Sequence, residues 1–389
     1  MDDTRQPRGA HLVGSVPLAD TEAVLRAAGA QLGAHLRRIP DGETGERGGF
    51  IGWQVPAFMQ LAGIAQTGDS RVAPPELGYA DAAIASYPIF AALRAQGIIP
   101  RNARFQVSLP TPIALVHALV DEGDHEAVEA LHATGMRAEL DRILAAIPHA
   151  DLAIQWDTPI EFAVLEGVMP SYYADPRAAI FERLPRWGGW VPAGVELGYH
   201  LCYGDNDGQH FIEPADAGLL VEVANHLAES LARPLNWVHM PVPQDRSDAA
   251  YYAPLAGLRP ETELYLGLVH LADGVDGARQ RIAAAVAVVP AFGVATECGM
   301  GRRAPETALA LLDLHAAIAH RSKPWTQTGR VRNEPNERSR LHHRRQFGDR
   351  GRASCGAPRA RRDGDHRRAR CRSASAGGGC TPWHGDLCA

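Results

Sequence analysis

Two side chains that can bind a metal ion stand two positions apart in residues 200–205, HLCYGD. Alternate residues of a β-strand point to the same face, so a strand that ends here projects His200 and Cys202 together. Imidazole nitrogen and thiolate sulfur are ligands that zinc prefers. The only other cysteine among residues 1–320 is Cys298, which follows another apolar run, and we expect it to be a third ligand.

A fourth ligand for this metal has two candidates. His239 ends the apolar run that comes next in the chain, and it is the first choice. Glu297 precedes Cys298 but points to the opposite face of a regular strand, so it is the second. The alternative for the whole set is structural, because buried cysteines also act as small apolar residues and a histidine can be a hydrogen-bonded core residue.

The elements that must position these residues alternate between two kinds. Short β-type runs are each followed by a helical segment, an order typical of a parallel β/α fold. Asp20 suits a helix N-cap, and Pro305 suits the first turn of a helix over residues 305–320. The eight runs favour a closed (β/α)8 TIM barrel over a doubly wound sheet, since no G-x-G-x-x-G follows the first run. The expected strands are residues 11–17, 36–42, 103–110, 151–159, 194–205, 235–243, 263–274 and 292–301.

Most of the expected strands end in polar side chains or turn residues. In a barrel the carboxyl ends of the strands meet at one mouth, where such folds place their active sites. Residues 160–193 are interpreted as an elaborated loop over that mouth, with packing against the outer helices as the alternative. Candidate site residues at the strand ends include Gly14, Ser15, Asp41, Glu43, Asp157, His200, Cys202, His239, His270 and Cys298.

Charge divides the chain near residue 320. Residues 321–389 carry a net charge of about +11 and residues 1–320 one of about −17. We expect residues 1–320 to form a single barrel domain and residues 321–389 to be a disordered basic tail, because the tail has no apolar periodicity. A change of reading frame near residue 321 is a second explanation of the tail. A nucleic-acid arm is a third, but aromatic residues are sparse there.

Composition also indicates where the protein works. No run approaches the roughly eighteen apolar residues of a membrane span, and the first ten residues, MDDTRQPRGA, lack the apolar segment of a signal peptide. Cys202 and Cys298 alone are not a disulfide framework for residues 1–320. We expect a cytoplasmic protein that binds neither a membrane nor nucleic acid.

Six short motifs between residues 11 and 303 resemble, in order, those of the cobalamin-independent methionine synthase family, especially its short single-barrel forms. LVGSVP resembles the family's first strand with I-G-S, PDGETGER its D-G-E/Q segment with a following arginine, and SLPTPIAL its G-P segment. IQWDTP resembles Q-x-D-E-P without the glutamate, HLCYGD resembles H-x-C-Y, and ECGMGRR resembles D-C-G-L-x-x-R. The resemblance implies a TIM barrel that catalyses zinc-dependent methyl transfer to a thiol.

The resemblance also implies a ligand set. His200, Cys202 and Cys298 correspond to zinc ligands of the family. The family's remaining ligand is a glutamate on the sixth strand, and this chain offers His239 near that position. The implied shell is therefore two histidines and two cysteines.

Substrate residues follow from the same comparison. Asp157 corresponds to the aspartate that holds the amino group of homocysteine. Gly14 and Ser15 correspond to the backbone segment that holds its carboxylate. The family's proton-transferring histidine has a counterpart in His270, at a shifted position.

The expected function is a zinc-dependent methyl (alkyl) transferase whose partners are a small-molecule thiol and a methyl donor. Zinc deprotonates a coordinated thiol that would otherwise be mostly protonated at pH 7. His270 or Glu43 would protonate the leaving group. Arg47, Arg302 or Arg303 would bind a substrate carboxylate or phosphate.

The alternative function is a metal-free, decarboxylase-like activity of the same barrel superfamily on an acidic substrate. It would use the charged residues near the second expected strand, which are Arg37, Arg38, Asp41 and Arg47. Metal content distinguishes the two functions.

Overall fold

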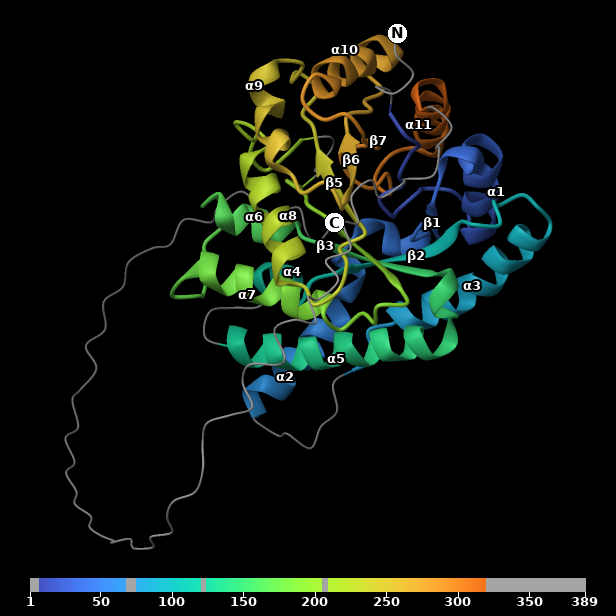
Figure 1. Ribbon diagram of the computed structural model, residues 1–389. Helices are drawn as coiled ribbons and strands as arrows, with labels where there is room; N and C mark the ends of the chain where they lie inside the picture. The colour runs from blue at the N-terminus through green and yellow to red at the C-terminus, as the bar shows by residue number, and fades with distance from the viewer. Residues whose placement is uncertain (1–6, 68–74, 120–123, 205–208, 320–389) are drawn as a thin grey trace, which may run out of the picture. The chain divides into compact units, whose positions relative to one another are not determined.

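The computed structural model describes residues 7–67, 75–119, 124–204 and 209–319 (Figure 1). These residues all belong to one compact unit, Met1–Thr326. The expected tail, residues 321–389, lies outside the described residues. Within the described ranges, no helix combines the length and the apolar character needed to cross a membrane.

A parallel sheet of seven strands forms the centre of this unit, with the strands in chain order from one edge to the other. Every pair of neighbours is parallel and is separated in sequence by helices, so the predicted β/α alternation is confirmed. The strands are β1 (Arg38–Pro40), β2 (Arg104–Pro110), β3 (Leu152–Asp157), β4 (Glu196–His200), β5 (Trp237–Pro241), β6 (Glu263–Gly267) and β7 (Gly293–Val294).

The two edges of the sheet meet through a single residue. Ala10 forms parallel bridges to Leu36, just before β1, and to Val294 of β7. The Ala10 N–H donates to the carbonyl of His35 at 3.0 Å, and the His11 N–H donates to that of Val294 at 2.9 Å. The sheet therefore curls on itself like a TIM barrel, with isolated bridges where an eighth strand was expected.

The prediction of a strand over residues 11–17 is wrong. Its backbone carbonyls pair with side chains inside the sheet instead of with neighbouring strands. The carbonyl of Val13 accepts hydrogen bonds from Gln106 at 2.8 Å, Gln155 at 2.7 Å and Ser108 at 3.0 Å. Because these donors satisfy the Val13 carbonyl, that group needs no strand partner where the segment leaves the sheet.

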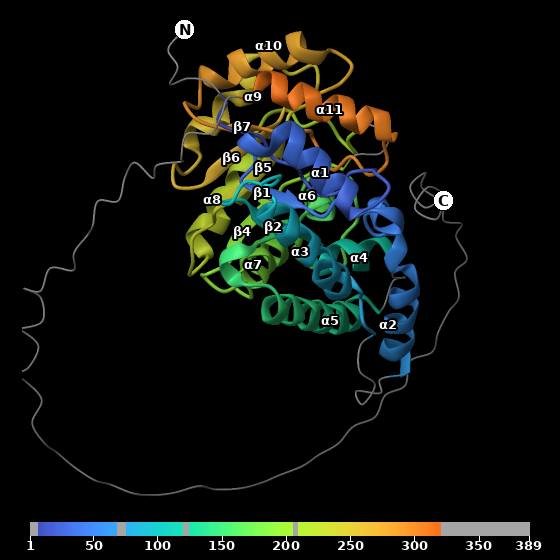
Figure 2. The ribbon, with the colours of Figure 1, turned by 90° about the vertical axis from the view of Figure 1, so that its right-hand side faces the viewer.

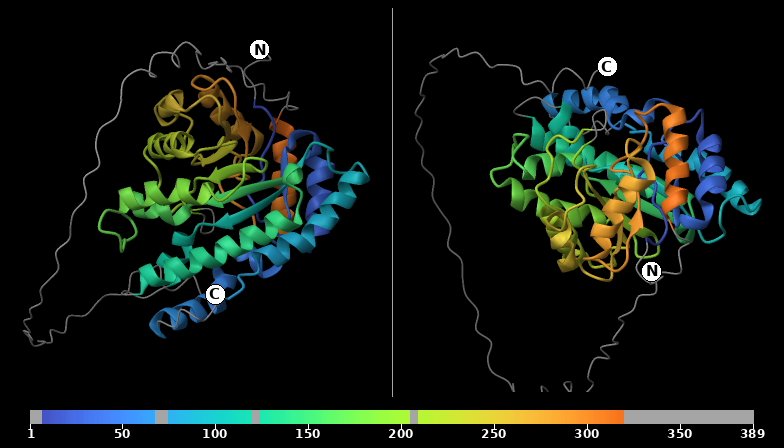
Figure 3. Two further views of the ribbon diagram at one scale, coloured as in Figure 1. Left: turned by 60° about the horizontal axis from the view of Figure 1, so that its bottom comes forward. Right: turned by 90° about the horizontal axis from the view of Figure 1, so that it is seen from above.

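Helices surround the sheet. Figure 2 shows α10, α11, α1, α3 and α5 succeeding one another across one side, and contacts between these neighbours agree. Figure 3 shows α1 in blue beside α11 in orange, although they lie at opposite ends of the described chain. The helices are α1 (Thr21–Leu32), α2 (Val55–Thr67), α3 (Tyr79–Ala95), α4 (Pro112–Leu119), α5 (His125–Ala146), α6 (Pro159–Leu165), α7 (Pro176–Gly188), α8 (Gly218–Ser230), α9 (Ala249–Tyr252), α10 (Gly274–Val286) and α11 (Pro305–Ile318).

Local sequence determines several of these boundaries. Asp20 is the N-cap of α1, where its carboxylate accepts from the Ala23 N–H at 2.8 Å, as predicted. Pro305 occupies the first turn of α11, also as predicted. Helices follow the expected strands, as the β/α alternation predicts, and α5 and α8 are two of them.

Residues 160–193 differ from the main expectation of a loop over the mouth. They form α6 and α7 and pack against the outer helices, which was the alternative. Both Tyr172 and Tyr173 donate hydrogen bonds to Glu129 of α5, at 3.1 and 2.7 Å. The side chain of Trp187 is completely buried.

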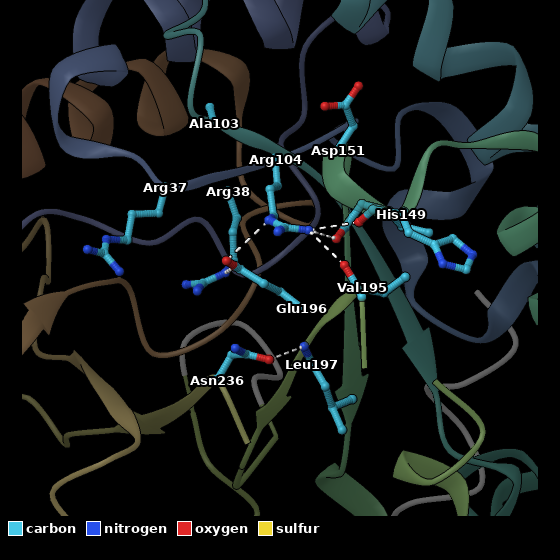
Figure 4. Close-up of polar contacts among 12 residues, drawn as sticks. Arg37, Arg38, Ala103, Arg104, His149, Asp151, Val195, Glu196, Leu197 and Asn236 are labelled. Carbon is cyan, nitrogen blue, oxygen red and sulfur yellow. Dashed lines mark hydrogen bonds and ion pairs between the residues drawn. The ribbon is translucent and has the colours of Figure 1, made fainter. Parts of the chain in front are cut away.

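A buried ionic layer joins the strands at their amino ends (Figure 4). Arg38 donates to Glu196 of β4 at 2.6 Å and to Glu263 of β6 at 3.1 Å. Its guanidinium carbon lies 4.0 Å from the ring centroid of Trp237 on β5. Arg104 of β2 also pairs with Glu196, at 3.2 Å. One layer thus connects four of the seven strands to Arg38 of β1.

We expect Arg38→Met to lower the free energy of unfolding by about 3 kcal/mol, because it removes the buried guanidinium from Glu196 and Glu263 and leaves them only the more exposed Arg104 and Arg37. Urea unfolding at pH 7.5 measures this. The matched control is Arg26→Met, which removes an exposed ion pair with Glu22 on α1 and should cost less than about 1 kcal/mol. Equal losses in the two variants would contradict a structural role for the buried layer.

Candidate functional site

Three potential metal ligands meet at the carboxyl ends of β4 and β7. His200 is the last residue of β4, and Cys202 lies two residues later. Cys298 lies in the loop after β7. One ligand atom from each lies within 4.8 Å of the others. Within the part of the chain that the structure describes, no other group of three or more His, Cys, Asp or Glu residues forms such a cluster. The structure thus brings together residues 96 positions apart.

The donor atoms fit a zinc ion. Two sulfurs, each about 2.3 Å from a tetrahedral zinc, lie about 3.8 Å from each other, and the Sγ atoms of Cys202 and Cys298 are 3.8 Å apart. Nε2 of His200 is buried without a hydrogen-bond partner, which is uncommon for a polar atom and expected of a ligand nitrogen. Three protein ligands leave one position open, as in catalytic zinc sites.

His239 lies beside His200 but does not join the ligand group. Its Nδ1 is 2.7 Å from Nδ1 of His200, and its Nε2 is 2.9 Å from the carbonyl oxygen of Thr296. Burial lowers the pKa of His239 to about 3. Since both ring nitrogens are engaged, neither is available as a ligand in this structure, and the expected role of His239 needs correction.

The buried carboxyl group of Asp157 adjoins the sulfurs, and the partly buried one of Glu43 lies near Asp157. Asp157 ends β3, and burial raises its pKa, as does the nearby charge of Cys298. Glu43 lies in the loop after β1. Removal from water raises the pKa of Glu43, the carboxylates of Asp157 and Asp41 raise it further, and Arg47 opposes them. The expected acidic residues therefore lie near one another, with Asp157 next to the ligand group.

The backbone at Glu43 is strained. Its φ is +46°, a left-handed value that is unfavourable for residues with a side chain. The strain is held by Asp41, which accepts from the Glu43 N–H at 2.9 Å and pairs with Arg47 at 2.8 Å. Non-glycine residues in this region concentrate at functional sites.

Gly14 and Ser15 lie against this loop and against the segment after Cys298. A Cβ at Gly14 would approach Oε1 of Glu43 to 2.7 Å, so only glycine leaves the carboxyl group its position. The hydroxyl of Ser15 accepts from the Gly301 N–H at 3.0 Å. Gly14 thus lies against Glu43, and Ser15 lies against the glycines that follow Cys298.

The orientation of the Asp157 carboxylate is fixed by a hydrogen bond from Gln155, two residues earlier on β3. Nε2 of Gln155 donates to the Asp157 carboxylate at 2.9 Å and to the Val13 carbonyl at 2.7 Å. The side-chain Oε1 of Gln155 lies 2.9 Å from Nε2 of His11, with which it forms a hydrogen bond. Because the amide is engaged at both ends, it fixes one orientation of Asp157.

A second histidine cluster surrounds Glu297, the other candidate for the fourth ligand. Its two carboxylate oxygens lie 3.2 Å from Nε2 of His210 and 3.3 Å from Nδ1 of His270. Burial lowers the pKa of His270. Burial also opposes the charge on His210, but the carboxylates of Glu297 and Glu213 outweigh it and raise the pKa of His210 to about 9. The sequence does not predict His210 as a site residue, because it does not lie at the end of any expected strand.

The arginines proposed for substrate binding are distributed differently from the expectation. Arg37 and Arg38 belong to the amino end of β1, where both pair with Glu263, so they do not reach the mouth. Arg47 pairs with Asp41 beside Glu43. Arg302 is exposed after the ligand loop.

Comparisons with known proteins found similar solved structures, among them the following two. No family model and no curated protein matches the chain. A solved structure named "Putative Vitamin-B12 Independent Methionine Synthase" from Listeria monocytogenes has 15% identity and a TM-score of 0.49, covering 81% of this chain and 99% of that one. A B12-independent methionine synthase from Shewanella sp. W3-18-1, in complex with selenomethionine, has 15% identity and a TM-score of 0.42, covering 63% of this chain and 67% of that one. The functional argument below rests on this chain's own residues.

We expect Glu43→Gln to stabilise the protein in a pH-dependent way. Because the folded-state pKa of Glu43 is raised above its ordinary value of 4.5, the wild type loses stability as the pH rises above 4.5. The variant should be more stable by about 1 kcal/mol at pH 7.5 and equal to the wild type near pH 4.5. Urea unfolding at the two pH values measures the difference.

The matched control for this test is Glu46→Gln, which neutralises an exposed carboxylate on the same loop. It should show no such gain. A gain for Glu43→Gln that is the same at both pH values, or that Glu46→Gln reproduces, would contradict the burial of an ionisable group.

Proposed function

We propose that this protein is a zinc-dependent enzyme that transfers a methyl or other alkyl group to a small-molecule thiol. The observation that carries the proposal is the group of His200, Cys202 and Cys298, with ligand atoms within 4.8 Å of one another and directly beside buried Asp157. A thiol substrate suits such a place, since it offers a soft sulfur to the open metal position and a charged group to the carboxylates.

His200, Cys202 and Cys298 would hold the metal. A zinc ion bound there lowers the pKa of a coordinated thiol, so that a nucleophilic thiolate is present near pH 7. Burial of His200 and Cys202 limits the access of water, which strengthens the electrostatic contacts there.

The acidic residues would bind the rest of the thiol substrate. Asp157, held by Gln155, offers a fixed carboxylate to an ammonium group, and Glu43 lies close enough for the two charges to interact. An ammonium group would lower the free energy of the Asp157 carboxylate, because it supplies a counter-ion. Gly14 and Ser15 would line the same space, with backbone N–H groups for a substrate carboxylate.

Transfer would proceed by attack of the substrate sulfur on the alkyl carbon. The sulfur–carbon bond forms as the bond between that carbon and the donor breaks, and the electron pair leaves with the donor. A protonated side chain then supplies a proton to the leaving atom. Glu43 is better suited than His270, since the upward shift of its pKa favours the protonated carboxyl group, whereas both ring nitrogens of His270 are engaged by Val242 and Glu297.

The metal-free alternative has less support. A decarboxylase-like site for an acidic substrate needs arginines that face the mouth. Arg37 and Arg38 instead pair with glutamates at the opposite end of the sheet, and Arg47 pairs with Asp41. Arg302, which follows the ligand loop and is exposed, stays the candidate for binding an acidic part of either substrate.

We expect protein purified without added metal to contain about one zinc per chain. Elemental analysis by mass spectrometry measures this content. Cys202→Ser and Cys298→Ser should each lose most of the zinc, because serine is a poor ligand for this ion. The control removes the four cysteines of residues 321–389 together and should retain the zinc. A zinc-free wild type that is folded and active would end the proposal.

We expect Asp157→Asn to discriminate between thiol substrates. Homocysteine carries an ammonium group and 4-mercaptobutyrate lacks it, so the loss of one charged hydrogen bond should lower kcat/KM about 10- to 100-fold for homocysteine alone. The assay follows thiol consumption with 5-methyltetrahydrofolate or the sulfonium S-methylmethionine as the methyl donor. Equal losses for the two thiols would contradict ammonium binding by Asp157. No consumption of either thiol by the zinc-loaded wild type, with either donor, would count against the transferase.

A further inference from the structure

The environment of His239 assigns it a role that its residue type alone does not reveal. In the register of β4 and β5, His200 pairs with His239, and their Nδ1 atoms are 2.7 Å apart. A neutral imidazole has one N–H donor and one acceptor nitrogen. One of the two rings must therefore donate to the other, and the remaining contacts of His239 decide which.

The second contact of His239 is to a backbone carbonyl. Its Nε2 is 2.9 Å from the Thr296 oxygen, and a carbonyl can only accept, so Nε2 carries the proton. His239 is completely buried and its ring bonds go to an imidazole and a carbonyl, so a charged ring would have no counter-ion among its partners. A neutral His239 with its proton on Nε2 has a lone pair on Nδ1. The ring of His200 must then donate from Nδ1, which leaves the lone pair of its Nε2 free.

The neighbouring strand leaves room for this arrangement. Gly267 of β6 lies beside the hydrogen bond between His239 and Thr296. A Cβ at Gly267 would lie 3.0 Å from Nε2 of His239 and 2.8 Å from the Thr296 oxygen. Any side chain at this position would therefore press on the bond. Residues of β4, β5 and β6 therefore together determine which ring nitrogen of His239 carries the proton.

We propose that His239 is a positioning residue, which fixes the tautomer and ring orientation of His200 so that Nε2 of His200 is the metal ligand. The inference rests on the metal site of the proposed function. Hydrogen-bond partners of ligating histidines act in this way in general, and their loss weakens metal binding about 10- to 100-fold. His239 thereby contributes to the site without touching the metal.

Two variants separate this role from direct ligation. His239→Asn keeps an acceptor near the position of Nδ1, whereas His239→Phe fills the ring volume and offers none. His226→Phe is the control, since it removes a partly buried histidine of α8 that bonds to the Phe181 carbonyl, away from the site. Each protein is stripped of metal and titrated with Zn²⁺ against a chromophoric chelator, and with Co²⁺ by absorption spectroscopy.

We expect His239→Phe to weaken Zn²⁺ binding about 10- to 100-fold, and His239→Asn and His226→Phe to stay within about threefold of the wild type. The Co²⁺ spectrum should keep its thiolate charge-transfer bands and the positions of its d–d bands in all of them, because no ligand is lost. A His239→Phe variant with unchanged affinity, or with d–d bands shifted as for the loss of a nitrogen ligand, would overturn the inference.

A measurement on the unmodified, metal-free chain keeps the test independent of the variants. Long-range ¹H–¹⁵N spectra of protein labelled at histidine report the tautomer of each ring. We expect the Nδ1–H form for His200 and the Nε2–H form for His239, and the reverse assignment would overturn the inference. Failure of the wild type to bind Zn²⁺ would instead reject the proposed metal site, so the two failures are distinguishable.

Discussion

The pairing of β4 with β5 is the constraint on which the site depends. It places His200 beside His239 and leaves one lone pair of His200 directed at no protein atom. A slip of one residue in this register would turn the side chains of β4 to the opposite face and would separate His200 from Cys298. The group of proposed metal ligands thus depends on backbone pairing as well as on the loops that carry the two cysteines.

The register is itself fixed by packing one layer below. Gly198 of β4 pairs with Trp237 of β5, and a Cβ at Gly198 would fall 2.0 Å from the indole ring. The indole fills the space of the missing side chain and lies under the Arg38 guanidinium, which in turn binds Glu196 and Glu263. Shifting either strand would place the indole against a side chain and break buried ion pairs. The ionic layer therefore stabilises the fold and holds the ligand strands in place.

The sequence predicts what depends on local periodicity and misses what depends on side-chain pairing across the sheet. Seven of eight strands and the convergence of Cys202 with Cys298 follow from alternation and from strand ends. The course of the backbone near Val13 does not, because glutamines on β2 and β3 replace its strand partners. His239 is a plausible ligand by type, and only the carbonyl of Thr296 shows that both its nitrogens are engaged. The contact of His210 with Glu297 could not be predicted, because nothing in the spacing of the two residues in the sequence indicates that they meet.

Several residues at the carboxyl ends of the strands lower the stability of the folded protein. Glu43 has a strained backbone, and both Glu43 and Asp157 keep carboxyl groups away from water with raised pKa values. Such groups favour a bound cation, and the neighbouring sulfurs favour one as well, but of a different kind. The thiolates select a soft metal ion, whereas the carboxylates suit an ammonium group. A substrate that contains both a thiol and an ammonium group would interact with the metal group and with the carboxylates at the same time. The metal group alone would not distinguish it from a simple thiol, and the carboxylates alone would not distinguish it from a simple amine.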